Sequence, residues 1–214
     1  MLGNRDWQGQ ASVEHSRRCH RNRTLGIKVD IAAGGIDNLA RHQDYTLSIA
    51  EAVSGEKFAS YWLHGAHLFV NGSKMSKSKS NVIYPDDLAA RDHTGDHIRF
   101  FLICRHYRVK LNFTYEKLDA SRRRLDDFKS MVQDLGKAES SNPSDQAKKL
   151  VCTIVPRFEK AMNDDLNVKD AFDGLFDIVL RLDRLNKKGR LMVQDVKSAL
   201  DKLARVDRVL RVIF

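Results

Sequence analysis

The chain has 214 residues, of which 42% are hydrophobic and 30% are charged, and its formal net charge is +9. This composition is typical of a folded globular protein and excludes a disordered or fibrous chain. The excess of Lys and Arg favours a polyanionic partner, such as nucleic acid or a nucleotide.

Three cysteines, Cys19, Cys104 and Cys152, are widely spaced and form no CxxC pair. They indicate neither a disulfide framework nor a thiolate zinc knuckle, and they fit a reducing compartment. The first thirty residues are polar and lack the apolar core of a secretory signal. No apolar run approaches the length of a membrane span. We therefore expect a cytoplasmic protein with no membrane partner.

Residues 1–72 combine strand-like and helix-like patterns, as expected of an α/β segment. Alternating apolar and polar residues over 25–31 predict a strand, and Ala32–Gly35 predicts a tight turn after it. A helix is expected from about Arg41 to Val53, ending at Ser54-Gly55. A second strand is expected over Phe58–Val70, followed by a turn at Asn71-Gly72.

Residues 73–135 begin with a loop rich in Lys and Ser, and helical spacing follows over 85–90, 94–104 and 115–135. Residues 136–146 are polar and form the clearest linker. After the linker, residues 147–214 predict a bundle of three helices over 147–162, 168–185 and 193–213. Pro156 predicts a kink in the first of these helices, and Asn167 is the expected N-cap of the second.

The residues with the most specific chemistry are Lys74-Met75-Ser76-Lys77-Ser78. Two ammonium groups three residues apart on a loop of small residues can hold a polyphosphate between them, and the serine hydroxyls and backbone N–H groups add donors. Lysine is a mobile point charge that can stabilise charge developing when a phosphoanhydride breaks. The alternative is a solvated basic loop, but the order of the residues after a strand and a turn favours phosphate binding.

Five segments with matching order and spacing resemble class I aminoacyl-tRNA synthetases, specifically the cysteinyl-tRNA synthetase family. The segments are Lys74–Ser78 (KMSKS), Gly34–His42, Tyr61–Gly65, Arg99–Arg108 and Phe158–Asn167. The resemblance covers about residues 12 to 190. It implies a partial Rossmann-like α/β catalytic half, then a helical region that contacts the tRNA stem, then a helical bundle.

The family activity that the resemblance implies is ATP-dependent activation of an amino acid, with Mg, and its transfer to tRNA. Lys74 and Lys77 would then stabilise the pyrophosphate leaving group. Gly34, Gly35 and the residues Lys74, Met75, Ser76, Lys77 and Ser78 would bind ATP. Asp37 and His64 would face the amino-acid substrate, although Asp37 could equally be a helix N-cap or turn residue.

The family also binds zinc through two cysteines, a histidine and a glutamate, and this set is incomplete here. The second cysteine position is His15, the histidine is retained as His42, and the glutamate position is Thr46. Two candidate ligands are too few for a zinc site, which needs three or four. We therefore expect no zinc, and ordinary half-buried or surface roles for both histidines.

Clusters of basic residues suggest contact with RNA. Within the resemblance, we expect phosphate contacts from Arg105 and Arg108 and from the run Arg122, Arg123 and Arg124. The alternative for each cluster is a solvated surface.

No HIGH motif, which the family carries in the first half of its Rossmann fold, occurs in the chain. Catalysis by this chain alone is therefore expected to be incomplete. A separate chain supplying that half, or a homodimer, would cover the exposed edge of the half sheet. Two other functions stay open: a non-catalytic paralogue that binds tRNA or a synthetase, and a ligase that joins an activated amino acid to a small amine.

Overall fold

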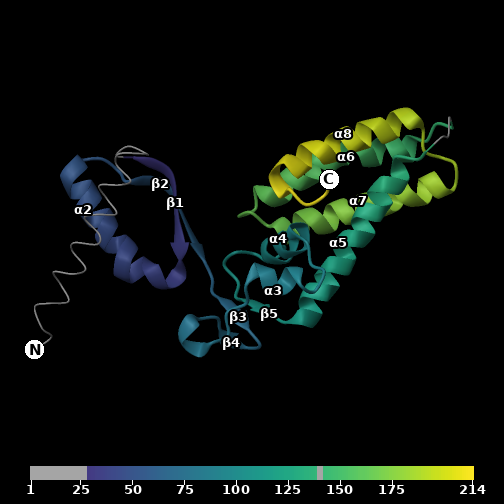
Figure 1. The fold of residues 1–214 in the computed structure, drawn as a ribbon. Coiled ribbons are helices and arrows are strands. Elements are labelled where there is room, and N and C mark those ends of the chain that lie inside the picture. The colour runs from purple at the N-terminus through teal and green to yellow at the C-terminus, as the bar shows by residue number, and fades with distance from the viewer. Residues whose placement is uncertain (1–27, 139–141) are drawn as a thin grey trace, which may run out of the picture. The chain divides into compact units, whose positions relative to one another are not determined.

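A computed structural model describes residues 28–138 and 142–214, with the side chains of Arg41 and His42 not described (Figure 1). The chain divides into two compact units. The first contains the described residues up to His67 together with Tyr107–Lys110, and the second contains Leu68–His106 and Leu111–Phe214. In the described residues no helix is both long enough and apolar enough to cross a bilayer. The expected mixed α/β part followed by a helical part is confirmed.

The first unit is a parallel pair of strands with one helix packed on it. Strands β1 (Val29–Gly35) and β2 (Ala59–Gly65) pair in register from Val29↔Ala59 to Gly35↔Gly65, and helix α2 (Asp44–Ser54) connects them. Its small core contains Ala50 of α2, Phe58 and Ala59. This strand–helix–parallel strand order is the unit from which open α/β sheets are built.

Three predictions in this unit were wrong in detail. Ala32–Gly35 is not a turn but the second half of β1, because every residue from Ala32 to Gly35 is paired with β2. The strand expected over Phe58–Val70 is two strands, β2 and β3 (Leu68–Val70), which belong to different sheets. The helix begins at Asp44 after a π-helical turn, and its end at Gly55, in the left-handed conformation (φ 70°), is confirmed.

The second unit begins with a small sheet in the order β4-β3-β5, where β4 is Ser73–Lys74 and β5 is Leu111–Phe113. Strand β3 is antiparallel to β4 and parallel to β5. Helices α3 (Pro85–Ala89) and α4 (Gly95–Ile103) pack on it through an apolar cluster formed with Val70, Phe113 and Leu118. Three-residue strands such as β5 carry too little alternation to be found in the sequence.

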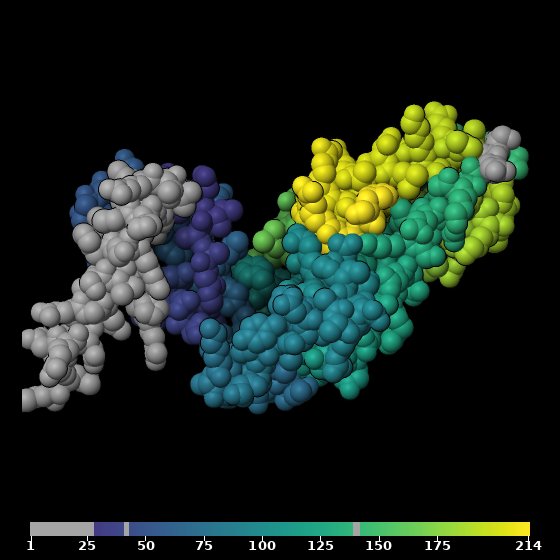
Figure 2. Space-filling view, in the orientation of Figure 1, coloured from purple at the N-terminus to yellow at the C-terminus, as the bar shows by residue number. Residues whose placement is uncertain are grey.

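Helix α5 (Tyr115–Leu135) has the predicted bounds and leads into α6 (Asp145–Met162), α7 (Val168–Lys187) and α8 (Val193–Leu210). Their apolar faces form one continuous core that includes Phe128, Phe172 and Leu203. Side chains fill the space between these helices (Figure 2). The predicted N-cap at Asn167 is confirmed, since its Oδ1 accepts from the N–H of Asp170 at 3.2 Å. Pro156 lies inside the continuous helix α6.

The predicted third helix of the bundle was too long by three residues. Helix α8 ends at Leu210 because Arg211 adopts the left-handed conformation, with φ 57°. The buried carboxylate of Asp207 then accepts the backbone N–H groups of Val212 and Ile213, both at 2.8 Å, and of Phe214 at 3.3 Å. This single side chain therefore turns the last residues back onto the bundle.

Candidate functional site

The lysine loop, residues Lys74–Ser78, starts from a tight hairpin. Asn71 (φ 48°) and Gly72 (φ 80°) both have positive φ, which is the conformation that a two-residue turn between right-twisted strands requires. The turn predicted at these residues is confirmed by the pairs Val70↔Ser73 and Phe69↔Lys74. The N–H of Gly72 also donates to Oδ1 of Asn112 at 2.8 Å. The position of Lys74 is thus fixed by its pairing in the β3–β4 hairpin.

Two anchors hold the lysine loop to the sheet and the helices. The N–H of Met75 donates to the carbonyl of Leu68 at 3.0 Å, and its side chain packs against the apolar cluster of the second unit. The side chain of Asn81 accepts from the N–H of Ser76 at 2.9 Å and donates to the carbonyl of Lys74 at 3.2 Å. Sequence reasoning missed Asn81, and no motif at that position marked it.

The polar groups of the lysine loop stay at the surface. Lys74 and Lys77 are exposed, and the hydroxyl oxygens of Ser76 and Ser78 lie 3.2 Å apart. A 3₁₀ helix over Lys77–Lys79 ends at Ser80 in the left-handed conformation. Since Met75 packs into the apolar cluster between the two lysines, the loop presents two cations and two hydroxyls on a backbone that is anchored at Lys74, Met75 and Ser76. This arrangement can bind an anion with several phosphate groups.

A second group of predicted residues meets at the carboxyl ends of β1 and β2, where open α/β sheets bind ligands. Gly34 pairs with His64 and Gly35 with Gly65. Nε2 of His64 is hydrogen-bonded to Oε1 of Gln43, so the ring is held in one orientation. A Cβ on Gly34 would collide with the end of the Gln43 side chain, so a larger residue there would displace the group that is bonded to His64. Gln43 was not found from the sequence.

Asp37 lies in the 3₁₀ helix Ile36–Asn38, just after β1, and is exposed. The alternative role as an N-cap is wrong, because Gly35 is the N-cap of this 3₁₀ helix and Gln43 is the N-cap of α2. Oδ2 of Asp37 lies 3.8 Å from Nε2 of His67. A Cβ on Gly35 would lie 2.7 Å from Oδ1 of Asp37, so the glycine allows the carboxylate to fold back over the strand end. Asp37, His64 and the two glycines therefore lie at the same end of the β1–β2 pair, and their contact with a substrate stays a prediction.

Of the residues at the family's zinc positions that the sequence retains or replaces, the structure describes the side chain of Thr46 but not those of His15 and His42. His15 lies outside the described residues, and the side chain of His42 is not described. Thr46, at the third position, is a half-buried residue of α2 and is not a zinc ligand type. Across the described part of the chain, no three His, Cys, Asp or Glu side chains gather closely enough to hold a metal. The expectation of no zinc stays a prediction.

The arginines predicted to contact RNA have different surroundings. Arg105 and Arg123 are exposed, and Nε of Arg122 lies 3.5 Å from Oδ2 of Asp126. Arg108 is exposed in the first unit, with its guanidinium 5.0 Å from the centre of the Tyr107 ring. Phosphate contact by these four residues stays a prediction.

Arg124 takes part in the packing of α5 on α7. Its guanidinium lies 2.5 Å from the carboxylate of Asp173 and 5.4 Å from the centre of the Phe176 ring. Burial acts to raise the pKa of Asp173, but hydrogen bonds from Lys169 and Arg124 outweigh it and hold that pKa below its usual range. Burial raises the pKa of the nearby Cys104 thiol to about 12, against the opposing effect of the Arg124 charge. Arg124 thus has a structural role whether or not it touches RNA.

Two of the sequence segments quoted for the resemblance meet in space. Nε2 of His106, in the segment Arg99–Arg108, lies 3.5 Å from Oδ2 of Asp165, in the segment that joins α6 to α7. Asp165 (φ 50°) and Leu166 (φ 58°) are both in the left-handed conformation. The left-handed conformation is energetically unfavourable for residues other than glycine. Contacts with the surrounding structure must therefore stabilise this connection.

Comparison with known proteins identifies the family of the chain. The model of the class I (C) tRNA synthetase catalytic domain matches residues 13–123, and the model of the DALR domain matches residues 157–208. The first match covers the paired strands of the first unit, the lysine loop and the start of α5. The chain belongs to the class I tRNA synthetase family whose catalytic domain is of the (C) type.

The curated relatives it resembles are cysteine–tRNA ligases. It is 40% identical over 192 residues to that of Chlamydia pneumoniae, 36% identical to that of Chlamydia felis and 33% identical to that of Protochlamydia amoebophila. Each match covers 88% of this chain and 40% of the relative, so the chain spans well under half the length of these proteins.

A solved structure shares the fold. The ternary complex of LeuRS, tRNA and LeuAMS from Agrobacterium radiobacter K84 has a TM-score of 0.65 and 15% sequence identity, and the match covers 86% of this chain and 26% of that chain. At this identity the likeness concerns the fold alone.

Proposed function

We propose that this chain carries the phosphate-binding loop, part of the amino-acid pocket and a tRNA-contacting region of a cysteinyl-tRNA synthetase-like enzyme. The observation that carries the proposal is the geometry of the lysine loop. Its backbone is held by Met75 and Asn81, while Lys74 and Lys77 stay at the surface. A loop that served only solubility would need neither anchor.

In this proposal, the two ammonium groups bind the phosphates of ATP and stabilise the negative charge that gathers on pyrophosphate as it leaves. Because the loop is organised before ATP arrives, little reorganisation is needed when that charge develops. Mg would supply a further positive charge on the phosphate oxygens. Asp37 and His64 would face the amino acid at the carboxyl ends of β1 and β2. Exposed arginines, Arg105 and Arg123 among them, would hold tRNA phosphates.

The direct test is binding of Mg·ATP, and separately of tripolyphosphate, by isothermal titration calorimetry. Lys74→Ala/Lys77→Ala is expected to weaken binding at least about tenfold for each lost lysine. Lys79→Ala is the matched control, since it removes an exposed lysine from the same loop, and it should change binding by no more than about twofold. Equal losses in both variants would show general charge attraction and would reject the proposed role.

Catalytic competence is tested by ATP–pyrophosphate exchange with each of the twenty amino acids. Exchange with cysteine that is lost in Lys74→Ala/Lys77→Ala would support the synthetase function for this chain. Exchange with a different amino acid would favour the ligase that joins an activated amino acid to a small amine.

A non-catalytic tRNA-binding paralogue is the second candidate, and the replaced zinc positions favour it. His15 stands where the family has its second cysteine and Thr46 where it has a glutamate, and loss of the thiolate ligands would remove the soft zinc site that selects a thiol substrate. This candidate predicts no exchange with any amino acid, together with salt-sensitive tRNA binding that weakens in Arg105→Ala/Arg123→Ala.

We also propose that a further polypeptide covers part of the first unit. Ile31 and Tyr61 are direct partners in the β1–β2 pair, yet they are 59% and 70% exposed. Parallel strands are normally covered on both faces. A separate chain carrying the HIGH half, or a second copy, would cover them. Size-exclusion chromatography with light scattering tests the second copy, and a monomer at all concentrations would exclude it.

A further inference from the structure

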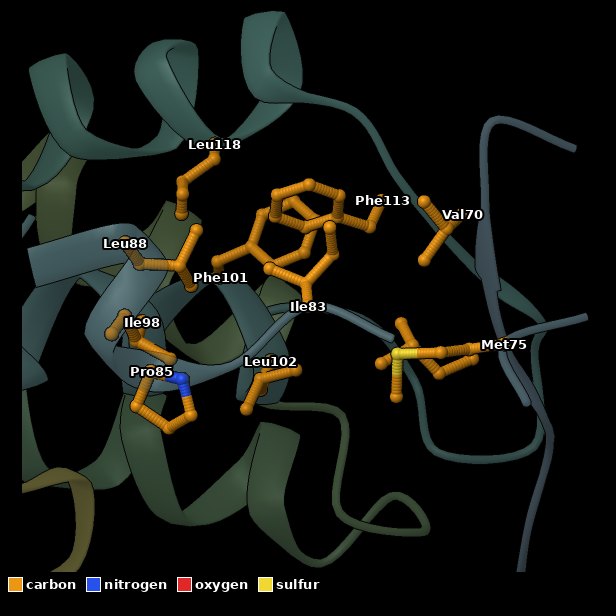
Figure 3. Close-up of a pocket in the computed structure, with 11 residues that line it drawn as sticks. Val70, Met75, Ile83, Pro85, Leu88, Ile98, Phe101, Leu102, Phe113 and Leu118 are labelled. Atoms are coloured by element: carbon orange, nitrogen blue, oxygen red, sulfur yellow. The ribbon is translucent and has the colours of Figure 1, made fainter. Parts of the chain in front are cut away.

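A cavity of about 150 Å³ lies directly behind the lysine loop, wholly within the second unit. Its wall is made of apolar side chains only, and Figure 3 shows them converging from the hairpin, the helices and β5. They are Leu68, Val70, Met75, Ile83, Pro85, Leu88, Ile98, Phe101, Leu102, Phe113 and Leu118. The cavity is therefore shared between the loop that carries the lysines and the core that supports it.

The chemistry of this wall disfavours an ordered water as occupant. A buried water needs two to four polar partners, and these side chains offer none. Cavities of about 150 Å³ with leucine, isoleucine and phenylalanine walls stay dry and bind benzene-sized molecules. An occupant here would restore dispersion contacts that the wall atoms now lack.

The cavity has a route to solvent and a wall suited to aromatic rings. Leu102 is 46% exposed, and Pro85 is exposed, so the rim reaches the surface. The rings of Phe101 and Phe113 meet edge to face, with centres 5.7 Å apart and planes at 85°. The thioether of Met75 lies on the other side of the space in Figure 3, and sulfur makes favourable contacts with aromatic ring edges.

We propose that this cavity is a binding site for a small neutral aromatic molecule, and that its occupancy controls the mobility of the lysine loop. Met75 links the two, because it is at once part of the wall and the residue between Lys74 and Ser76. A ligand that packs on the Met75 side chain favours the anchored conformation of the loop over an open one. Binding at either place therefore stabilises the other. Neither ATP nor tRNA is needed for this site to bind its ligand.

Nuclear magnetic resonance of the protein with ¹³C-labelled methionine methyl groups tests the site with toluene as the probe. The Met75 signal, assigned with Met75→Leu, is expected to move saturably under the ring current of the bound toluene. The signals of Met131, Met162 and Met192, which are not in the wall, should stay in place. Trypsin, which cleaves after Lys74 and Lys77, should cut the loop about tenfold more slowly when toluene is at ten times its dissociation constant.

Two variants close the site from different sides. Leu102→Trp blocks the rim at an exposed position, and Ile83→Phe fills the space from within; each should abolish the Met75 shift. Val193→Phe adds a ring at an exposed position of α8 outside the wall, and it should keep the shift.

Two results would contradict different parts of the proposal. No saturable Met75 shift in the parent protein, or an equal shift in both closing variants, would overturn the site. A saturable shift with unchanged trypsin cleavage would overturn the control of the loop.

Discussion

Replacing Asn81 by alanine should loosen the lysine loop without unfolding the protein. The amide of Asn81 makes two hydrogen bonds to the loop backbone, one from the N–H of Ser76 at 2.9 Å and one to the carbonyl of Lys74 at 3.2 Å. Each is worth about 0.5–1.5 kcal/mol net, and their partly exposed setting places the total at about 1–2 kcal/mol. Loss of these bonds lowers the free energy of local opening of the loop and has little effect on the free energy of global unfolding.

Hydrogen exchange of the Ser76 amide measures this opening directly. A loss of about 1–2 kcal/mol predicts exchange about 5 to 30 times faster in Asn81→Ala. Asn81→Asp keeps the acceptor for Ser76 and loses the donor to Lys74, so it should lie between the parent and the alanine variant. The thermal midpoint should change little in either.

Asn112→Ala is the matched control, because the Asn112 amide oxygen accepts from the N–H of Gly72 in the same hairpin. It should speed exchange of the Gly72 amide and leave the Ser76 amide unchanged. If the Ser76 amide exchanged at the parent rate in Asn81→Ala, Asn81 would not be the residue that organises the loop, and the reasoning would be refuted.

Three further predictions concern stability. Gly72→Ala forces a side chain into φ 80° and should cost about 1 kcal/mol in thermal unfolding, whereas Gly95→Ala, at the open first turn of α4, should be neutral or slightly stabilising. Asp207→Ala leaves three backbone N–H groups without their acceptor and should cost about 3–5 kcal/mol in urea unfolding; a loss below about 1 kcal/mol would contradict the capping role. The pKa of Asp173 is lower in the folded protein than its ordinary value of about 4, so its ion pairs stabilise the fold above that pH, and the stabilisation is lost as pH falls through the folded pKa. The stability difference between the parent and Asp173→Asn should therefore shrink between about pH 6 and about pH 3, and a constant difference would reject this assignment.

Much of the helical part of the chain could be predicted because it depends on local patterns. The apolar spacing of Leu118, Leu125 and Phe128 gave the bounds of α5, and all three residues are buried in the structure. The N-cap at Asn167 and the turn at Asn71-Gly72 follow from side-chain and backbone preferences of a few neighbouring residues. The proposed polyphosphate chemistry of Lys74 and Lys77 also rests on residue type and short spacing, and it stays a prediction.

What depended on distant residues could not be predicted in this way. Ala32–Gly35 has the composition of a turn, yet pairing with β2 makes it a strand, and its two glycines lie against the side chains of Gln43 and Asp37. Asn81 became part of the candidate site only when the chain folded back toward Ser76.

The sequence by itself therefore determined the helices of the bundle and the tight turn, because each depends on neighbouring residues, and it is also the source of the proposed chemistry of the lysine loop. The tertiary structure decided which backbone groups of the lysine loop are hydrogen-bonded, which arginines form ion pairs within the protein, and where an apolar cavity remains between the side chains. Those outcomes depend on contacts between segments far apart in the chain, such as the packing of Arg124 on α7, and no local pattern encodes such contacts.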